Sequence, residues 1–308
     1  MTATRRAFAI RAVLVLLSLP LAVALIEAWA FHAANRNNGT MVSSGEHREY
    51  LLYVPTTYDQ TRSTPLVISI HAAGLWPTAQ MRTSRWNAEA ERGGFIVAYP
   101  AGVDGNGPRI WRADGGPGLA KDVRFIADLI DTLSVHYHID ATRIYANGLS
   151  NGGGMSFVLS CALADRIAAV GMVGAAHLLP FRWCTDRRPV PMIAFHGTAD
   201  PVVPYAGGTT WVARDRFPGI AGFTSQWARR NRCGATALEA KVAPDVTRFS
   251  YGDCADGADV VLYRVEDGGH TWPGGEPLPE WFTGRTSNGV DATALMWAFF
   301  RAHPRATH

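Results

Sequence analysis

A glycine-rich stretch with one central serine is the part of the chain best suited to chemistry. Gly148, Ser150 and Gly152 have the spacing Gly-x-Ser-x-Gly, between a strand-like run at 143–147 and a helix-like run at 155–163. A sharp strand-to-helix turn would raise the Ser150 hydroxyl above the edge of a sheet, and glycine best tolerates the crowding on either side. The pattern predicts a nucleophile elbow. Its alternative is a glycine-rich turn that carries an incidental serine.

Two further strand-like runs lead to the groups that a serine nucleophile requires. The run 190–195 leads to Asp200, and the run 259–265 leads to a loop that contains His270. A serine hydroxyl needs a base within hydrogen-bond reach, and that base needs a carboxylate that fixes its tautomer. We therefore expect Ser150 to be the nucleophile, His270 the general base and acid, and Asp200 the orienting acid.

Each of these assignments has a structural alternative. The alternative for Asp200 is that it only forms a turn, because it precedes Pro201 and Asp-Pro favours turns. Asp267, three residues before His270 on the same loop, is a rival acid. A separate alternative is that His270 is an ordinary loop histidine without a catalytic role. Structural hydrogen bonds, capping or solvent exposure, rather than metal binding, are expected of the histidines at His71, His196, His136 and His138.

An early strand-like run supplies candidates for an oxyanion hole. The run 65–70 is followed by a loop at 71–75. Backbone N–H groups aimed at a developing oxyanion are worth about 3 to 4 kcal/mol each. We expect the two donors to be the N–H of Asn151, directly after the nucleophile, and the N–H of Ala73, with Ala72 as the weaker choice.

Several segments match a known family. They are Arg48-x-Tyr50 to Val54-Pro55, Pro65-Leu66-Val67 to His71, Gly94-Phe95-Ile96-Val97-Ala98-Tyr99-Pro100, Asp122-Val123-x-Phe125-Ile126, Gly148-Leu149-Ser150-Asn151-Gly152-Gly153, His196-Gly197-Thr198-Ala199-Asp200 and Gly269-His270-Thr271-Trp272-Pro273-Gly274. With them the chain resembles the secreted polyhydroxybutyrate depolymerase and feruloyl esterase group of α/β-hydrolases, from about Glu46 to the C-terminal helix.

The resemblance implies an α/β-hydrolase fold, with a mostly parallel central sheet flanked by helices on both faces. It also implies Ser150, Asp200 and His270 as the catalytic triad. One position departs from the family pattern, because the family usually has glycine after the histidine where this chain has Ala72. If that glycine requires a positive φ, Ala72 would shift the oxyanion loop.

The N-terminal residues have the layout of an export signal. Three arginines precede an apolar run at 12–26, and Ala28-Trp29-Ala30 offers a small-x-small cleavage pattern. A signal peptide or N-terminal anchor is therefore expected at 1–30. The protein is expected to be secreted or periplasmic, or else anchored in the membrane and facing outside the cytoplasm if the segment is not cleaved.

Composition is consistent with one catalytic domain after that leader. The chain has 308 residues, 47% hydrophobic residues and a formal net charge of +3, without a long basic run. Nucleic-acid binding is therefore not expected. We expect a linker at 31–45 and a single domain at 46–308. Within it, apolar periodicity predicts helices over 123–137, 222–231 and 291–303, the last with Asp291 as N-cap, and a buried strand over 167–173.

Four cysteines fit an oxidising compartment. Their spacings lack a C-x-x-C pair, so a zinc site is not expected, and three disulfide pairings are open. We favour Cys161 with Cys184 and Cys233 with Cys254, because each closes a loop of roughly 20 residues that constrains the unfolded chain by about 3 kcal/mol. The alternative is four free thiols in a cytosolic enzyme.

Ten tryptophans raise the question of which rings meet the substrate. Trp272, Trp76 and Trp111 lie near the catalytic motifs or in a glycine-rich loop, and flat rings in a cleft would suit a feruloyl group, a sugar or a hydroxyacid oligomer. Core packing is expected of Trp86, Trp227 and Trp297.

The sequence thus predicts a secreted serine carboxylesterase that needs no cofactor or metal. The resemblance implies hydroxyalkanoate oligoesters, or feruloyl and acetyl esters of plant polysaccharide, as substrates. A serine peptidase or amidase would use the same triad, and a catalytically silent binding protein could keep the same fold.

Overall fold

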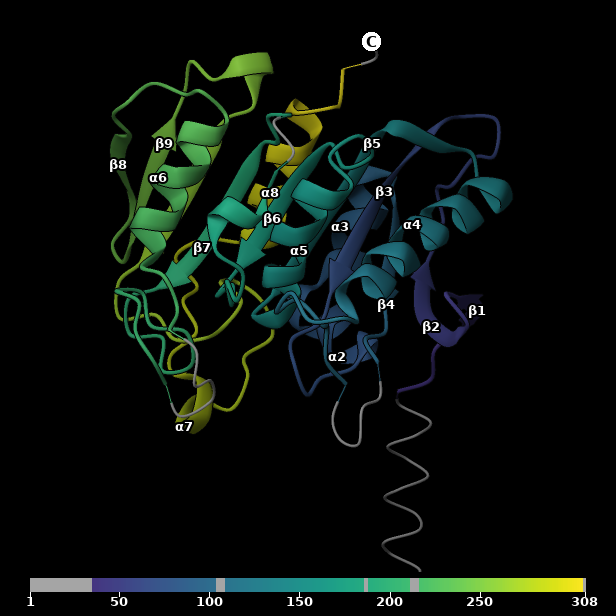
Figure 1. Cartoon of the computed structure of the whole chain (residues 1–308), viewed down its shortest axis with the longest axis horizontal. Coiled ribbons are helices and arrows are strands. Elements are labelled where there is room, and N and C mark those ends of the chain that lie inside the picture. The colour runs from purple at the N-terminus through teal and green to yellow at the C-terminus, as the bar shows by residue number, and fades with distance from the viewer. Residues whose placement is uncertain (1–34, 104–108, 186–187, 211–215, 307–308) are drawn as a thin grey trace, which may run out of the picture. The chain divides into compact units, whose positions relative to one another are not determined.

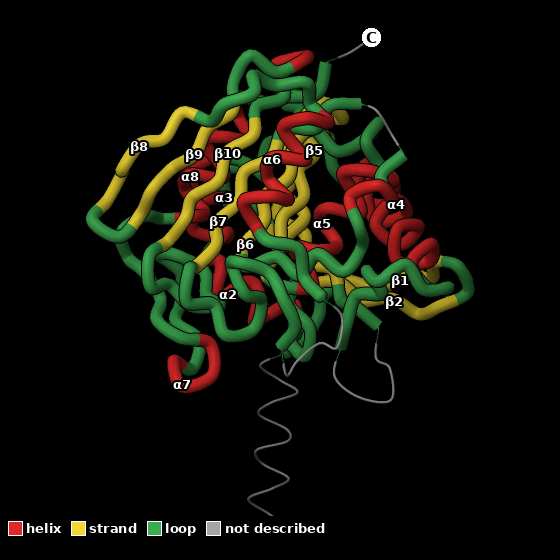
Figure 2. Tube along the Cα trace, turned by 60° about the vertical axis from the view of Figure 1, so that its left-hand side comes forward, coloured by secondary structure: helices red, strands yellow, loops and turns green. Residues whose placement is uncertain are grey.

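The part of the chain that can be described in the computed structural model comprises residues 35–103, 109–185, 188–210 and 216–306. Ten strands of these residues form one sheet, in the order β1-β2-β4-β3-β5-β6-β7-β10-β9-β8 (Figures 1 and 2). Their bounds are β1 Gly39–Ser43, β2 Glu46–Tyr53, β3 Thr64–Ile70, β4 Ile96–Pro100, β5 Ile139–Leu149, β6 Ala169–Val173, β7 Met192–Gly197, β8 Leu238–Ala243, β9 Val246–Tyr251 and β10 Val260–Val265.

The centre of the sheet is parallel and its two edges are antiparallel. Strands β4, β3, β5, β6, β7 and β10 pair in parallel, whereas β1 and β2 at one edge and β9 and β8 at the other pair antiparallel. All seven residues of β3 are buried, as expected of a parallel strand covered on both faces. The loops that follow the parallel strands therefore all lie on the same side of the sheet, beyond the C-terminal ends of these strands.

Helices cover both faces of the sheet (Figure 1). The helices are α2 Pro77–Ser84, α3 Trp86–Gly93, α4 Leu119–His136, α5 Asn151–Ala162, α6 Ile220–Arg230, α7 Glu280–Thr283 and α8 Ala292–Ala302, with short 3-10 turns at Phe181–Trp183 and Ala255–Gly257. One apolar layer joins α4, α5 and α6 to the sheet, and a second joins α3 and α8 to its other face. This is the α/β-hydrolase architecture that the sequence predicts.

The predicted elements agree with the structure apart from their ends and the linker. The side chain of Asp291 accepts a hydrogen bond from the Ala294 N–H and caps α8, as predicted. Residues 31–45 were expected to be a linker, but Gly39–Ser43 within that range forms β1 and pairs with β2. Its alternating exposure is that of an edge strand, which such a short polar segment does not reveal by itself.

The described residues from Asn37 onward form one compact unit. The expected leader at 1–30 lies outside the described residues.

Cys161 is bonded to Cys184 and Cys233 to Cys254, the pairing that the spacing favoured. Trp86, Trp227 and Trp297 are buried in the core, as predicted. Among the helices that can be described, none combines the length and apolar character needed to cross a bilayer.

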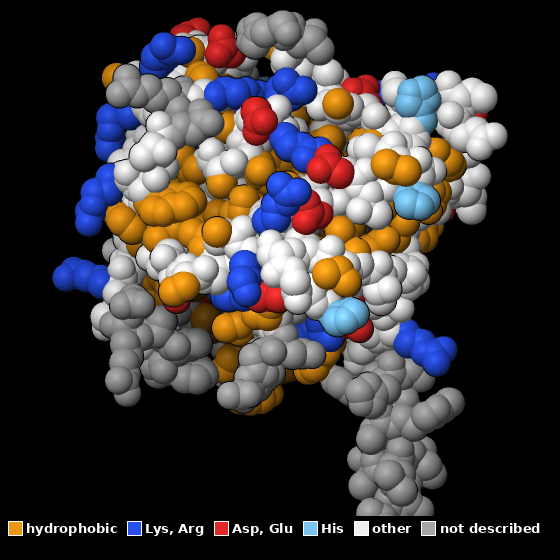
Figure 3. All heavy atoms as spheres, turned by 45° about the vertical axis from the view of Figure 1, so that its right-hand side comes forward, with side chains coloured by type: hydrophobic (Ala, Val, Ile, Leu, Met, Phe, Trp, Pro, Cys, Tyr) orange, Lys and Arg blue, Asp and Glu red, His pale blue; other side chains and the backbone are white. Residues whose placement is uncertain are grey.

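A buried ionic network holds the loop before α4 against the edge of the sheet. Asp122 in α4 is fully buried and its carboxylate lies 2.8 Å from Arg48 of β2 and 2.5 Å from Arg112 of the loop. Glu46 joins the network through Arg112 at 2.9 Å and through Lys121 at 3.0 Å. Acidic and basic side chains also lie side by side across the face shown in Figure 3.

Replacement of Asp122 should be costly because it removes the nearer and fully buried counter-ion of the Arg48 guanidinium and leaves only Glu46, at 3.4 Å. We expect Asp122→Asn to lower the free energy of unfolding by about 3 to 5 kcal/mol, measured by urea denaturation. The control is Asp131→Asn, which removes an exposed partner of Arg166 and should cost less than about 1 kcal/mol. Equal losses in the two variants would contradict this account of the network.

The ionisation of Glu46 makes the free energy of unfolding depend on pH in the acidic range. Hydrogen bonds from Arg112, opposed by partial burial and aided by Lys121, lower the pKa of Glu46 from 4.5 to about 2. Because the folded pKa lies below the unfolded one, the contribution is complete above pH 4.5 and is lost as the pH falls towards 2. Glu46→Gln should therefore show a shallower loss of unfolding free energy across this window than wild type. The exposed control Glu276→Gln should follow the wild-type curve, and coincident curves for wild type and Glu46→Gln would refute the assignment.

Candidate active site

Ser150 occupies a sharp turn between β5 and α5. Its φ of 55° and ψ of −118° are unusual for a residue other than glycine. A Cβ atom added to Gly148 would lie 2.4 Å from the carbonyl carbon of Gly152, and one added to Gly152 would lie 2.2 Å from the carbonyl oxygen of Ile70. Both glycines are therefore required by close backbone packing, and the strained turn is the elbow that the motif predicts.

His270 and Asp200 are in direct contact beyond the ends of β10 and β7. The His270 Nδ1 lies 2.8 Å from the Asp200 Oδ2, and both side chains are buried. The other oxygen, Oδ1, accepts the N–H groups of Val202 at 2.8 Å and Val203 at 2.7 Å. Burial opposes ionisation of this carboxyl, but the His270 charge and the hydrogen bonds from His196 and His270 hold its pKa well below the usual value. An ionised Asp200 accepts the Nδ1 proton, which leaves Nε2 as the free acceptor of the imidazole.

The loop after β6 brings Ser150 and this pair together. The Ser150 N–H donates to the carbonyl of Val173 at 2.9 Å, and the Ala176 N–H donates to the carbonyl of Ser150 at 2.9 Å. Gly174 lies between these contacts, and a Cβ added to it would be 3.0 Å from His270 Nδ1 and 3.4 Å from an Asp200 carboxylate oxygen. The imidazole thus packs against the segment that flanks the Ser150 backbone.

The loop expected to supply an oxyanion donor is fixed by His71. Nδ1 of this buried ring donates to the Ala72 carbonyl at 2.8 Å, and Nε2 accepts the Gly102 N–H at 2.9 Å. Burial lowers the pKa of His71 from 6.5 to about 4, so the neutral ring can accept and donate at once. Ala72 does not have a positive φ, whereas Gly74 has a φ of 78°. The alanine that replaces the usual glycine is therefore accommodated without backbone strain.

Asn151 has a second role that the sequence analysis missed. It is the first residue of α5, where backbone N–H groups lack partners within the helix. Its side chain also accepts the Trp111 N–H at 2.7 Å and donates to the Trp111 carbonyl at 3.1 Å. This pair of bonds ties the loop before α4 to the elbow.

Two of the three tryptophans expected at a substrate cleft are buried. Trp272 is fully buried and its Nε1 donates to Thr293 Oγ1 at 2.9 Å. Trp111 is 2% exposed and stacks on Phe125. The expectation that these rings contact substrate is therefore wrong. Trp76 is partly exposed directly before α2 and stays a candidate.

The alternative acid and the flanking histidine are also placed by the structure. Asp267 is exposed at a turn with a φ of 53°, and its backbone N–H is bonded to Thr198. His196 is buried, and its Nε2 lies 2.8 Å from the Val203 carbonyl and 3.4 Å from Asp200 Oδ2. His196 thereby closes the loop that carries Asp200. Its position four residues before the acid was the available sequence signal.

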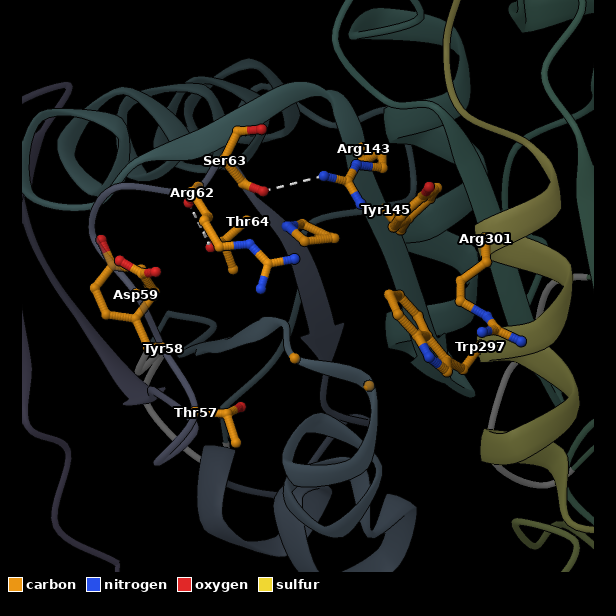
Figure 4. Close-up of a pocket in the computed structure, with 13 residues that line it drawn as sticks. Thr57, Tyr58, Asp59, Arg62, Ser63, Thr64, Arg143, Tyr145, Trp297 and Arg301 are labelled. Carbon is orange, nitrogen blue, oxygen red and sulfur yellow. Dashed lines mark hydrogen bonds between the residues drawn. The ribbon is translucent and has the colours of Figure 1, made fainter.

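The described residues contain no cluster of three or more histidine, cysteine, aspartate or glutamate side chains arranged to hold a metal ion. A cavity of about 410 Å³, whose lining does not include Ser150, lies beside the start of β3 and is bordered by residues of β5 and α8 (Figure 4). Its walls include Arg62, which precedes β3, Arg143 in the first half of β5, and Trp297 of α8. Ligands of open α/β sheets bind beyond the C-terminal ends of the strands. The cavity in Figure 4 therefore does not belong to the Ser150 site.

Comparison with known proteins finds esterases among the relatives of this chain. A family model described as Esterase PHB depolymerase matches residues 48–178. Feruloyl esterase B of Piromyces equi is 31% identical over 230 residues, 72% of this chain, and the match spans 42% of that longer protein. Putative esterase NocK of Nocardia uniformis subsp. tsuyamanensis is 30% identical over 253 residues, which cover 76% of this chain and 73% of the relative.

A solved structure supports the fold. Acetyl xylan esterase from Aspergillus awamori aligns with a TM-score of 0.56 at 18% identity, over 76% of this chain and 93% of that chain. The elbow, the strand order and these relatives agree. The chain belongs to the polyhydroxybutyrate depolymerase and feruloyl esterase-like family of α/β-hydrolases.

Proposed function

We propose that the protein is a serine carboxylic ester hydrolase in which Ser150 is the nucleophile, His270 the general base and acid, and Asp200 the orienting acid. The observation that carries this proposal is the 2.8 Å contact between His270 Nδ1 and Asp200 Oδ2, packed against the segment that flanks Ser150. The strained backbone of Ser150 supports the same assignment, because elbows of this kind expose a nucleophile at the edge of a sheet.

The proposed chemistry proceeds through an acyl-enzyme. His270 Nε2 takes the proton of the Ser150 hydroxyl while Oγ attacks the ester carbonyl, and the imidazolium then gives that proton to the departing alcohol. Water adds to the acyl-enzyme with His270 as base again, which releases the acid and restores the serine. Asp200 stays ionised throughout and stabilises the imidazolium.

The negative charge that develops on the carbonyl oxygen needs donors that are already in place. The N–H groups of Asn151 and Ala73 are the candidates, one at the start of α5 and one in the loop that His71 anchors. Such donors act strongly in a site with little water and need no reorganisation during the reaction.

The proposed substrates are feruloyl or acetyl esters of plant polysaccharide, or hydroxyalkanoate oligoesters. The names of the relatives, feruloyl esterase B among them, support this class. The proposed location is outside the cytoplasm, since two disulfides fit an oxidising compartment. A signal peptide or anchor at 1–30 is part of the same proposal.

Covalent labelling tests the nucleophile. Wild type should be labelled by a fluorophosphonate probe, and Ser150→Ala should not be labelled and should lose several powers of ten in ester turnover, because the attacking oxygen is gone. Ser156→Ala, which changes a buried hydroxyl in α5 bonded to the Gly152 carbonyl at 3.0 Å, is the control and should still be labelled. Absence of labelling in both wild type and the control would favour a silent binding protein.

A second substitution tests the acid. Asp200→Asn should lower kcat by about 10⁴, because an amide in place of the carboxylate favours the wrong tautomer of His270. Asp267→Asn should keep near wild-type kcat, since its side chain is exposed. Steady-state kinetics on a soluble ester would measure both. Retained activity in Asp200→Asn together with lost activity in Asp267→Asn would transfer the role to Asp267.

A further inference from the structure

Helix α7 presents an exposed aromatic pair that the proposed chemistry does not use. Trp281 is 88% exposed and Phe282 is 38% exposed, and their rings meet edge to face at 5.8 Å. By contrast, Trp86, Trp227 and Trp272 are fully buried. A single exposed apolar residue is common, but two adjacent exposed aromatic rings form a surface that suits a binding role.

This helix is attached to the loop that carries the base. The His270 N–H donates to the Thr283 carbonyl at 2.5 Å, and the Gly269 N–H donates to the Arg285 carbonyl at 2.9 Å. A Cβ added to Gly284 would lie 3.8 Å from Pro201, the residue after Asp200. The aromatic pair therefore lies only a few residues from backbone that touches both the base loop and the acid loop, and Figures 1 and 2 show α7 projecting from this region.

The backbone on the C-terminal side of Trp281 is held by several hydrogen bonds. Within the turn, Thr283 is buried and bonds the Pro279 carbonyl through both its N–H and its hydroxyl, at 3.0 Å each. On its far side, the Arg285 guanidinium donates to the Glu266 carbonyl at 2.6 Å and to the Asp245 carboxylate at 3.0 Å. These bonds fix the backbone that carries Trp281, so a ligand that stacks on the ring does not have to order the helix first.

A small cavity with polar and apolar walls adjoins the start of α7, where Glu280, the residue before Trp281, forms part of its lining. It has a volume of about 180 Å³, and its walls include Glu280, Arg285, Thr286 and Asn288. The Thr286 hydroxyl is buried and has no hydrogen-bond partner within the described part of the chain. A buried hydroxyl without a partner is costly, so a ligand that bonds it would recover that cost. The cavity thus combines a carboxylate acceptor, a guanidinium donor, an amide and a hydroxyl.

We propose that Trp281 and this cavity form a subsite for a carbohydrate chain, so that the ester attacked by Ser150 is one carried on a polysaccharide. This inference rests on the proposed function and narrows its substrate class. An apolar face of a sugar ring stacks on an aromatic ring, and its hydroxyl groups both donate and accept hydrogen bonds. The Glu280 carboxylate only accepts, and therefore needs donors. A hydroxyalkanoate chain offers ester oxygens along its length, which are acceptors, so it satisfies this cavity less well.

Binding to a polysaccharide without ester groups tests the subsite apart from catalysis. The full chain with Ser150→Ala should be retarded in affinity electrophoresis through unsubstituted xylan. Adding Trp281→Ala should weaken this binding about 10-fold, because the stacking surface is lost. Adding Trp281→Tyr should keep most of it. Val135→Ala, which truncates a residue that is 82% exposed on α4, is the matched control and should bind as strongly as the parent.

Kinetics on the active enzyme give the second readout. Trp281→Ala should raise KM for acetylated xylan about 10-fold more than KM for p-nitrophenyl acetate. The inference is overturned if Trp281→Ala changes both KM values alike, or if the parent binds polyhydroxybutyrate granules and not xylan. Xylan binding that depends on Trp281 in a protein that hydrolyses no ester would refute the proposed function and leave the subsite standing.

Discussion

The hydrogen bond between the Asp200 carboxylate and the His270 imidazole is the constraint on which the site depends. The two residues follow β7 and β10, which are neighbouring parallel strands whose last residues, Gly197 and Val265, are paired. Parallel pairing sends both loops to the same edge, so residues 70 positions apart meet without a long detour. Strand β5, which ends before Ser150, is separated from β7 only by β6. The loop after β6 bridges that gap through its backbone bonds to Ser150.

Contacts from several other elements hold the loops around Ser150 in place. His71 fixes the proposed oxyanion loop as a neutral ring that donates on one side and accepts on the other. Asn151 clamps the backbone of Trp111, whose loop is in turn held by Arg112 and the buried Asp122. These contacts connect the elbow to α4 and β2. Donors that are fixed before the reaction stabilise developing charge better than donors that must be recruited.

Local patterns predicted much of the fold and of the site. Each proposed catalytic group follows an apolar run of strand length, and the elbow glycines stand where the backbone is closest packed, so these signals could be found in a few residues at a time. Of the three possible disulfide pairings, the one that loop length favoured is the one observed. Family resemblance added the architecture and the substrate class that is proposed above.

What could not be predicted depends on contacts between distant segments. Trp111 packs against Phe125 of α4, and Trp272 is bonded to Thr293 of α8. The residues next to each tryptophan in the sequence therefore do not show that it is buried. Strand β1 is defined by its pairing with β2 rather than by its own composition. The exposure of Trp281 could not be predicted either, because the sequence around a tryptophan does not show whether other segments of the chain cover its ring.

A crystal structure of the protein inactivated by a small phosphonate ester would test the central claim most directly. The account predicts phosphorus bonded to Oγ of Ser150, a phosphonyl oxygen facing the N–H groups of Asn151 and Ala73, and Nε2 of His270 within hydrogen-bond reach of the modified oxygen. Attachment to another residue, or an imidazole turned away from the adduct and separated from Asp200, would contradict it.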